Sequence, residues 1–373
     1  MIRLVLPLTH HLASLRPWMV ALALCLIYLA AVFALHHADP LTFLVMPEPP
    51  SAEHPQGTEG YDGQWVYHIA VNPITSPPHL DVPAYRLQRI LLPLLAHLLA
   101  LGRPALIPWT LLAIDLAAFV MGAIILEHLL KQAGVSPWWA LTYALSAGVM
   151  MSVRLSLTEP LAYALALAAI WLERNQRLQL AALVFALAGL AKEPTLIFVL
   201  GYMLWMLLER RWRDALLLGL IAWAPYLIWQ AILYLWLGQI GTGPGGGLRT
   251  PFELIPYMGF LRIYTETGSL PVFLAFAALN VPTVIVPSIW GIAASLRDML
   301  RRAWHPYSFL LLANAASVAI IPFSTFREPL GILRFLPGLT VSFLLYAAHF
   351  HRRRMLRYSL LWIATLAFAP ISG

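Results

Sequence analysis

The chain has 373 residues, of which 60% are hydrophobic and 11% are charged, and its formal net charge is +7. This composition excludes a soluble globular protein, whose surface needs far more charged residues. At roughly 20 residues per span plus connecting loops, the length allows about ten to twelve membrane-spanning helices. The single cysteine, Cys25, excludes an internal disulfide and a cysteine-based metal motif.

The N-terminal part of the chain is an apolar run followed by a long polar stretch. The run from Pro17 to His37 follows Arg3 and Arg16, and it resembles an uncleaved signal anchor. The next stretch, about 38–104, is rich in proline, glycine, histidine and acidic residues and is the longest part that does not span. It is therefore predicted to be a first loop outside the cytoplasm.

One apolar segment inside this loop, 85–101, carries a stripe of polar residues and proline. Arg86, Arg89, Pro93 and His97 are spaced three, four and four residues apart, so they share one face of a helix. Such a charged stripe is typical of a helix that lies in the membrane interface. We therefore expect an interfacial helix here.

The rest of the chain is a series of apolar segments that predicts further spans. With the first run they make about eleven transmembrane helices. The expected fold is all-α: a polytopic membrane protein whose single integral domain covers 1–373, with a second long outer loop at about 238–270. The further spans are expected at about 105–130, 137–152, 159–173, 178–191, 195–209, 214–237, 271–296, 304–322, 331–350 and 357–372.

Basic turns between the spans indicate the orientation. If 85–101 does not cross, every arginine-rich turn falls on one side, which the positive-inside rule makes cytoplasmic, together with the N-terminus. We therefore expect a multi-pass protein of the inner (plasma) membrane, and the basic charge predicts no nucleic-acid partner. These turns contain Lys131, Arg174, Arg177, Arg210, Arg211, Arg213, Arg297, Arg301, Arg302, Arg352, Arg353, Arg354 and Arg357.

Several cations lie on the outer side, against the positive-inside bias. The simplest reason for such a placement is an anionic ligand, and the phosphate of a lipid is the anion closest to a membrane. The alternative is that these cations pair with neighbouring acids and hold the loops together. The candidates for binding a donor phosphate are Arg86, Arg154, Lys192, Arg327 and Arg334.

A short motif in the first loop, followed by an interfacial helix and a many-spanning body, resembles the GT-C superfamily of membrane glycosyltransferases. The segment YDGQWVYHIA (61–70) is similar to the DG-x-x-Y element of bacterial GT-C-like cell-surface polysaccharide proteins. The segments RLQRILLPLL (86–95), TEP (158–160) and AKEP (191–194) follow in the order that such proteins show.

The resemblance implies transfer of a sugar, with inversion, from a polyprenyl-phosphate donor to a glycan, lipid or protein acceptor outside the cytoplasm. It also implies that membrane lipid is a binding partner of the protein. The chain departs from the metal-using members because no D-x-D pair surrounds Asp62; the nearest second acid is Glu59. The requirement for a divalent cation is therefore left open.

The chemistry assigns roles to residues of this motif. Inverting transfer needs a carboxylate that takes the proton of the acceptor hydroxyl, and Asp62 is the candidate. Cations must stabilise the charge that develops on the leaving phosphate. The alternative for Asp62 is a helix N-cap, a position that aspartate favours. The candidates for substrate binding are Glu59, Trp65, Tyr67, His68, Glu159 and Glu193, where the aromatic residues could instead anchor the helix at the interface.

Two other classes of function stay open at this point. A non-catalytic subunit of a glycan-assembly complex would keep the architecture without a reactive Asp62. A transporter or flippase of lipid-linked sugars would have inverted repeats and ionisable groups near the bilayer midplane. The sequence contains no clear repeat and one such acid, Asp115, within a predicted span.

Overall fold

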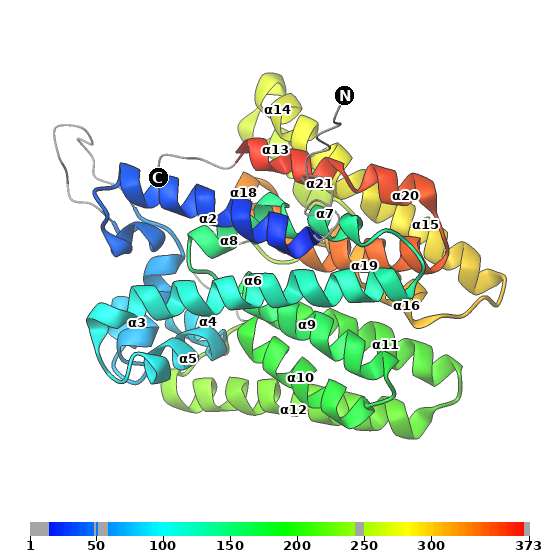
Figure 1. Cartoon of the computed structure of the whole chain (residues 1–373), viewed down its shortest axis with the longest axis horizontal. Coiled ribbons are helices and arrows are strands. Elements are labelled where there is room, and N and C mark those ends of the chain that lie inside the picture. Colours follow the sequence, from blue (N-terminus) through cyan, green and yellow to red (C-terminus); the bar gives the residue numbers. More distant parts are fainter. Residues whose placement is uncertain (1–14, 48–49, 51–58, 243–249, 369–373) are drawn as a thin grey trace, which may run out of the picture.

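The computed structural model describes residues 15–47, 50, 59–242 and 250–368. Within these ranges the regular structure consists of α-helices, short 3-10 turns and one π-helical turn, without any strand (Figure 1). The all-α prediction is therefore confirmed for the described part of the chain.

The first half of the chain contains two long helices separated by the short helices of the first loop. Proline occupies the first turn of many elements, where its missing N–H costs nothing. The elements are α2 (Pro17–Leu35), η1 (Pro40–Phe43), α3 (Gly63–Val71), η2 (Pro77–His79), α4 (Pro83–Leu87), α5 (Leu91–Leu99), η3 (Pro104–Leu106), α6 (Ile107–Gln132), η4 (Pro137–Ala140), α7 (Leu141–Ala144), α8 (Ala147–Arg154), α9 (Glu159–Arg174) and α10 (Leu178–Ala191).

The second half continues with helices of mixed length. Pro329 and Pro337 start two consecutive helices, α18 and α19, that are bent by 43° against one another. The elements are η5 (Glu193–Thr195), α11 (Leu196–Leu208), α12 (Trp212–Leu237), α13 (Met258–Thr267), α14 (Leu270–Asn280), η6 (Val281–Ile285), α15 (Val286–Leu300), α16 (Pro306–Ala319), α17 (Phe323–Phe326), α18 (Pro329–Phe335), α19 (Pro337–His349), α20 (Arg353–Tyr358), α21 (Leu361–Ala364) and η7 (Thr365–Phe368).

The long apolar helices define a membrane protein. Among the described residues, four helices are long and apolar enough to cross a bilayer, or five if the bent pair α18–α19 counts as one span. Apolar side chains on these helices are exposed, as with Ile27 at 66% and Leu235 at 85%, which suits contact with lipid. The four helices are Pro17–Leu35, Pro104–Gln132, Trp212–Leu237 and Leu270–Leu300.

Two segments that were predicted as spans are broken instead. The segment 137–152 forms η4, α7 and the start of α8, because Ser146 adopts an extended conformation (ψ 143°) between two helices. The described part of 357–372 forms short helical pieces, and Trp362 is buried among the other helices, where its indole N–H donates to the carbonyl oxygen of Thr283. Neither segment is a continuous helix of membrane-spanning length.

The predicted interfacial helix at 85–101 is also two helices. Pro93 has no backbone N–H, and its ring clashes with the carbonyl four residues earlier, at Arg89, in a continuous helix. The chain accordingly leaves the helix after Leu87 and resumes at Leu91. Helices α4 and α5 have 5 and 9 residues, so neither can span a bilayer.

Helix α19 is the centre of the packing. Every residue from Pro337 to Ala348 is buried, as expected for a helix that is apolar all round. Helices α6, α9, α10 and α12 run side by side below it in Figure 1, and α3, α4 and α5 gather at one end of the molecule. At that end of the molecule, the first loop lies beside the start of α9 and beside α18.

Two glycines allow backbones to meet closely at this end. A Cβ atom on Gly63, which follows Asp62, would lie 2.4 Å from the carbonyl oxygen of Leu155. A Cβ atom on Gly148 would lie 2.0 Å from the carbonyl oxygen of Leu333, next to Arg334. Only glycine permits these approaches, which fix α3 and α18 against the two ends of α8.

We expect Gly63→Ala to destabilise the protein, because the new methyl group would push against backbone rather than against a side chain that can turn away. Forcing a group into a packed contact costs about 1–3 kcal/mol. The matched control is Gly219→Ala, where the nearest atom is the flexible Cε of Met203 at 2.8 Å. Thermal unfolding in detergent should show a clear loss for the first variant and little for the second. Equal melting temperatures would contradict the close contact at Gly63.

Candidate functional site

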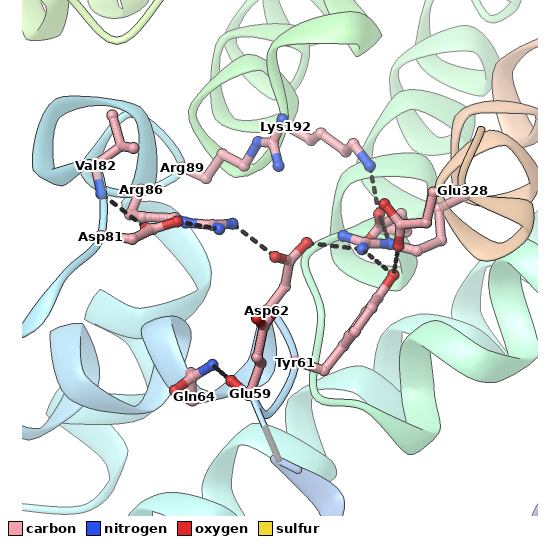
Figure 2. A network of polar contacts seen from close by, with 12 residues as sticks. Glu59, Tyr61, Asp62, Gln64, Asp81, Val82, Arg86, Arg89, Lys192 and Glu328 are labelled. Carbon is pink, nitrogen blue, oxygen red and sulfur yellow. Dashed lines mark hydrogen bonds and ion pairs between the residues drawn. The ribbon is translucent and has the colours of Figure 1, made fainter. Parts of the chain in front are cut away.

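Asp62 stands immediately before α3, but its side chain does not cap the helix. It makes no capping hydrogen bond. Instead, Arg86 donates through Nη1 to Oδ1 at 2.7 Å, and Arg334 donates through Nη1 to Oδ2 at 2.7 Å (Figure 2). The N-cap interpretation therefore describes the backbone position of Asp62 and not the function of its carboxylate.

Arg334 joins Asp62 to a buried group of charges. Its Nε donates to Oε1 of Glu159 at 2.7 Å, and the same oxygen accepts a hydrogen bond from Lys192. Its Nη1 also donates to the Tyr61 hydroxyl at 2.9 Å, and this hydroxyl donates to Oε1 of Glu328 at 2.5 Å. Glu159 has 0% exposure, so its charge is stable only because both cations accompany it.

Two further arginines come from the segment around the break between α4 and α5. Arg86 binds both carboxylate oxygens of Asp81 at 2.8 Å. Arg89 binds both oxygens of Glu193 at 2.7 and 2.9 Å. Both guanidinium groups also lie over the ring of Tyr85, at 5.3 and 4.8 Å from its centroid. Two-pronged ion pairs and ring contacts hold planar guanidinium groups in fixed orientations.

These side chains surround a cavity at the junction of α3, α4, α5, α9 and α18. Three guanidinium groups and one carboxylate line it, and Trp65 and Tyr85 contribute aromatic walls. The lining itself thus has more cations than carboxylates, although Asp81, Glu193 and Glu159 pair with the same arginines from outside it. The lining residues are Asp62, Trp65, Val66, Ile69, Tyr85, Arg86, Arg89, Pro93, Leu157, Thr158 and Arg334.

The cations determine the protonation state of the carboxylates outside the spans. Burial alone would raise the pKa of Asp62, but Arg334 and Arg86 outweigh it and hold that pKa well below its usual range. For Asp81, the hydrogen bonds and charge of Arg86 likewise overcome burial and lower the pKa. Burial raises the pKa of Tyr61, so its hydroxyl stays protonated and can donate to Glu328. Asp62 is thus an anion throughout the neutral range.

The structure brings together most, but not all, of the predicted site residues. Arg86, Lys192, Arg334, Glu159 and Glu193 join the network around Asp62, and Trp65 lines the cavity with Arg86 at 5.6 Å from its ring. Glu159 pairs with Lys192 and Arg334, and Glu193 pairs with Arg89.

Arg154 and Arg327 lie away from the cavity. Arg154 is buried and donates to the carbonyl oxygen of Thr42 at 2.7 Å, since the end of α8 faces the loop after α2. Arg327 is exposed at the end of α17, with its guanidinium 5.7 Å from the ring of Phe323. The structure therefore does not bring these two predicted phosphate ligands to this cavity.

Three predicted substrate contacts also lie outside the cavity lining. Tyr67 packs against the apolar cluster between α3, α5 and α6. His68 stacks on His79 with a centroid distance of 5.7 Å, and burial together with His79 lowers its pKa. Glu59 is exposed, and its backbone carbonyl accepts a hydrogen bond from Gln64.

Sequence reasoning missed four members of the site: Arg89, Tyr61, Tyr85 and Glu328. Arg89 lies three residues after Arg86 on the polar face of the helix predicted at 85–101. This spacing was a signal that could have placed Arg89 beside Arg86. Tyr61 and Tyr85 adjoin Asp62 and Arg86 in the chain. Glu328 had no local signal, since its contact with Tyr61 spans 267 positions.

No metal centre is formed by the residues that the structure describes: no group of three or more His, Cys, Asp and Glu side chains is placed to hold an ion. Within the site, both oxygens of Asp62 face guanidinium groups. The requirement for a divalent cation remains open.

Comparison with known proteins identifies no relative. The chain matches no family model, and the searches of curated proteins and of solved structures also give no match. The class that the helices define is a helical membrane protein, and its distinguishing feature is a charged cavity at one end of the bundle.

We expect Glu159→Gln to destabilise the protein strongly, because it leaves Lys192 and Arg334 as buried cations without their shared carboxylate. Breaking a buried pair costs about 3–5 kcal/mol. Glu193→Gln is the matched control, since that side chain is 23% exposed and pairs with Arg89 alone. Its loss should be smaller in chemical unfolding of the detergent-solubilised protein. A Glu159 variant as stable as the Glu193 variant would mean that the buried pair is not required.

Proposed function

We propose that the protein is an inverting glycosyltransferase of the GT-C type. It moves a sugar from a polyprenyl-phosphate donor to a glycan, lipid or protein acceptor outside the cytoplasm. The observation that carries the proposal is the cavity in which Arg86, Arg89 and Arg334 surround Asp62. Such a set supplies both things the reaction needs, which are cations for a phosphate and a carboxylate for a proton.

In the proposed reaction the acceptor oxygen forms a bond to the anomeric carbon of the sugar. The bond from that carbon to the phosphate oxygen breaks, and its electron pair stays on the phosphate. The proton of the acceptor hydroxyl passes to Asp62. The products are an inverted glycoside and polyprenyl phosphate, whose additional negative charge is stabilised by the guanidinium groups.

The location of the cavity supports the same proposal. Helices α3, α4 and α5 belong to the first loop, and the start of α9 and helix α18 bring Thr158 and Arg334 to the same end. We propose that this end faces outward across the inner (plasma) membrane, that the shorter apolar helices complete a bundle of about eleven spans, and that α3 to α5 lie at the interface. A lipid-linked donor would then present its phosphate at cavity level.

Asp62→Asn tests the base directly. The variant keeps the size of the side chain but cannot accept a proton, so transfer should fall by a factor of about 10² or more. Purified protein would be assayed with a panel of radiolabelled polyprenyl-phosphate sugars. Asp214→Asn is the control, because it removes a carboxylate that pairs with Arg211 in the first turn of α12. Transfer at the parental rate by the Asp62 variant would leave the proposal without a base.

The orientation is tested by labelling introduced cysteines. Thr75→Cys and Arg353→Cys replace exposed residues in the first loop and at the start of α20, while native Cys25 is buried. An impermeant maleimide should label the Thr75 variant on intact cells and the Arg353 variant only after permeabilisation. Labelling of the Arg353 variant alone on intact cells would reverse the orientation and place the cavity in the cytoplasm.

One observation favours a second candidate, a transporter of lipid-linked sugars. Asp115 is fully buried in α6, and neither of its carboxylate oxygens has a hydrogen-bond partner among the described residues. Ionisable groups inside spans often mark transport pathways. Reconstituted protein that moves a lipid-linked sugar between leaflets, with no transfer to any acceptor, would favour this candidate over the enzyme. A non-catalytic assembly subunit would do neither.

A further inference from the structure

The two arginines on Asp62 create a conflict with its proposed chemistry. Each carboxylate oxygen accepts a charge-assisted hydrogen bond at 2.7 Å, one from Arg86 and one from Arg334. A base needs a free lone pair and an affinity for protons, and paired guanidinium groups reduce both. In the arrangement described, Asp62 is therefore held in a form that is poorly suited to accept a proton.

The same arrangement resembles an occupied anion site. A carboxylate presents two oxygens and one negative charge to the two guanidinium groups. A phosphodiester, such as a sugar linked through phosphate to an isoprenoid alcohol, also presents two terminal oxygens and one negative charge. Arginine recognises both groups in the same two-oxygen manner. Asp62 thus fills the position that suits the phosphodiester.

Both arginines have other anchors that would remain if Asp62 moved away. Arg86 keeps both oxygens of Asp81 and its contact with Tyr85. Arg334 keeps Glu159 through Nε, at 2.7 Å. The bond to Asp62 uses only Nη1 of each guanidinium group. Losing Asp62 would therefore free one donor on each arginine without releasing either arginine from its place.

Of the two carboxylates that Arg334 joins, Asp62 is the better placed to move. Its side chain is 29% exposed, whereas Glu159 has 0% exposure and holds two buried cations. It lies at the junction between the loop 59–62 and α3, and its side chain accepts hydrogen bonds from the two arginines and none from the helix end. A change of side-chain rotamer can therefore release it from one guanidinium group.

We propose that Asp62 occupies the position between Arg86 and Arg334 that suits a phosphate, and that the phosphodiester of the donor displaces it from at least one of the two arginines. This inference rests on the proposed function and names the ligand class as a singly charged phosphodiester. The displaced carboxylate, freed from one cation, is then available to the acceptor hydroxyl. Donor binding thereby prepares the base for the transfer.

If Asp62 and the phosphodiester compete for the same arginines, removal of Asp62 has an effect on binding that can be measured. An Asp62 that only held the arginines in place would not have this effect. Removing Asp62 should strengthen phosphate binding, because the ligand no longer has to displace a carboxylate. We expect Asp62→Asn and Asp62→Ala to bind geranyl methyl phosphate, a short isoprenoid phosphodiester, about tenfold more tightly or better, on the scale of one charge-assisted hydrogen bond. Titration calorimetry of the detergent-solubilised protein measures this without any activity. The alanine variant shows whether the new amide itself contacts the ligand.

Two further variants make the measurement specific. Asp214→Asn changes the net charge by the same amount at another arginine pair and should leave the affinity unchanged. In an Arg86→Gln background, the gain from Asp62→Asn should shrink, since one of the contested guanidinium groups is absent. A gain that persists unchanged in that background would contradict competition for Arg86.

The outcomes separate this inference from the function on which it rests. Tighter binding by both Asp62 variants, with the Asp214 variant unchanged, supports it. Binding by the parent that is equal to or stronger than that of both variants overturns the inference and leaves the donor site in place. Absence of binding by the parent and both variants overturns the inference together with the proposed donor site.

Discussion

The arrangement of this end of the molecule depends on the bridge that Arg334 makes between Glu159 and Asp62. The three residues come from α18, the start of α9 and the start of α3, and the pairs are separated by 175 and 272 positions in the chain. Glu159 is completely buried and could not carry a charge without Arg334 and Lys192. The network therefore positions the cavity and also ties the first loop to the helical bundle.

The arginines are held by a repeated combination of contacts. Arg86 and Arg89 each donate two hydrogen bonds to one carboxylate, and both lie over the ring of Tyr85. Such pairs order the guanidinium groups before any ligand arrives, which lowers the entropy lost on binding. The cost is that each of these arginines already has an anionic partner, so any anion that bound here would have to compete for their donors.

The pattern of apolar and charged residues in the sequence was sufficient to predict the class of fold and part of the site. The apolar segment 178–191 coincides with α10, and the cations placed against the positive-inside bias included Arg86, Lys192 and Arg334, which do meet. The same rule also selected Arg154, which does not line the cavity, because the rule locates a residue along the chain but not the direction of its side chain. Which acid pairs with which base depends on helix packing, and no local pattern encodes the contact of Glu159 with Arg334.

The hydropathy pattern also did not predict where the helices break. Hydropathy averages over a window and reads 137–152 as one apolar segment, although Ser146 turns the backbone within it. The break after Leu87 was readable in principle, since Pro93 forbids a regular helix through Arg89. Continuous spans are thus easier to predict than the short, bent elements from which the cavity is built.

The burial of α19 has a consequence for how the cavity can open. Arg334 lies in α18, just before the buried helix α19, and the backbone of Leu333 beside it packs closely against Gly148. We expect this wall to resist displacement, since a close-packed interior leaves little room for its elements to move. The opposite wall, made of α3, α4 and α5, consists of short helices joined by loops. An opening of the cavity that leaves α18 and α19 in place would therefore have to come from that side, and it would also have to separate Gly63 from the carbonyl oxygen of Leu155.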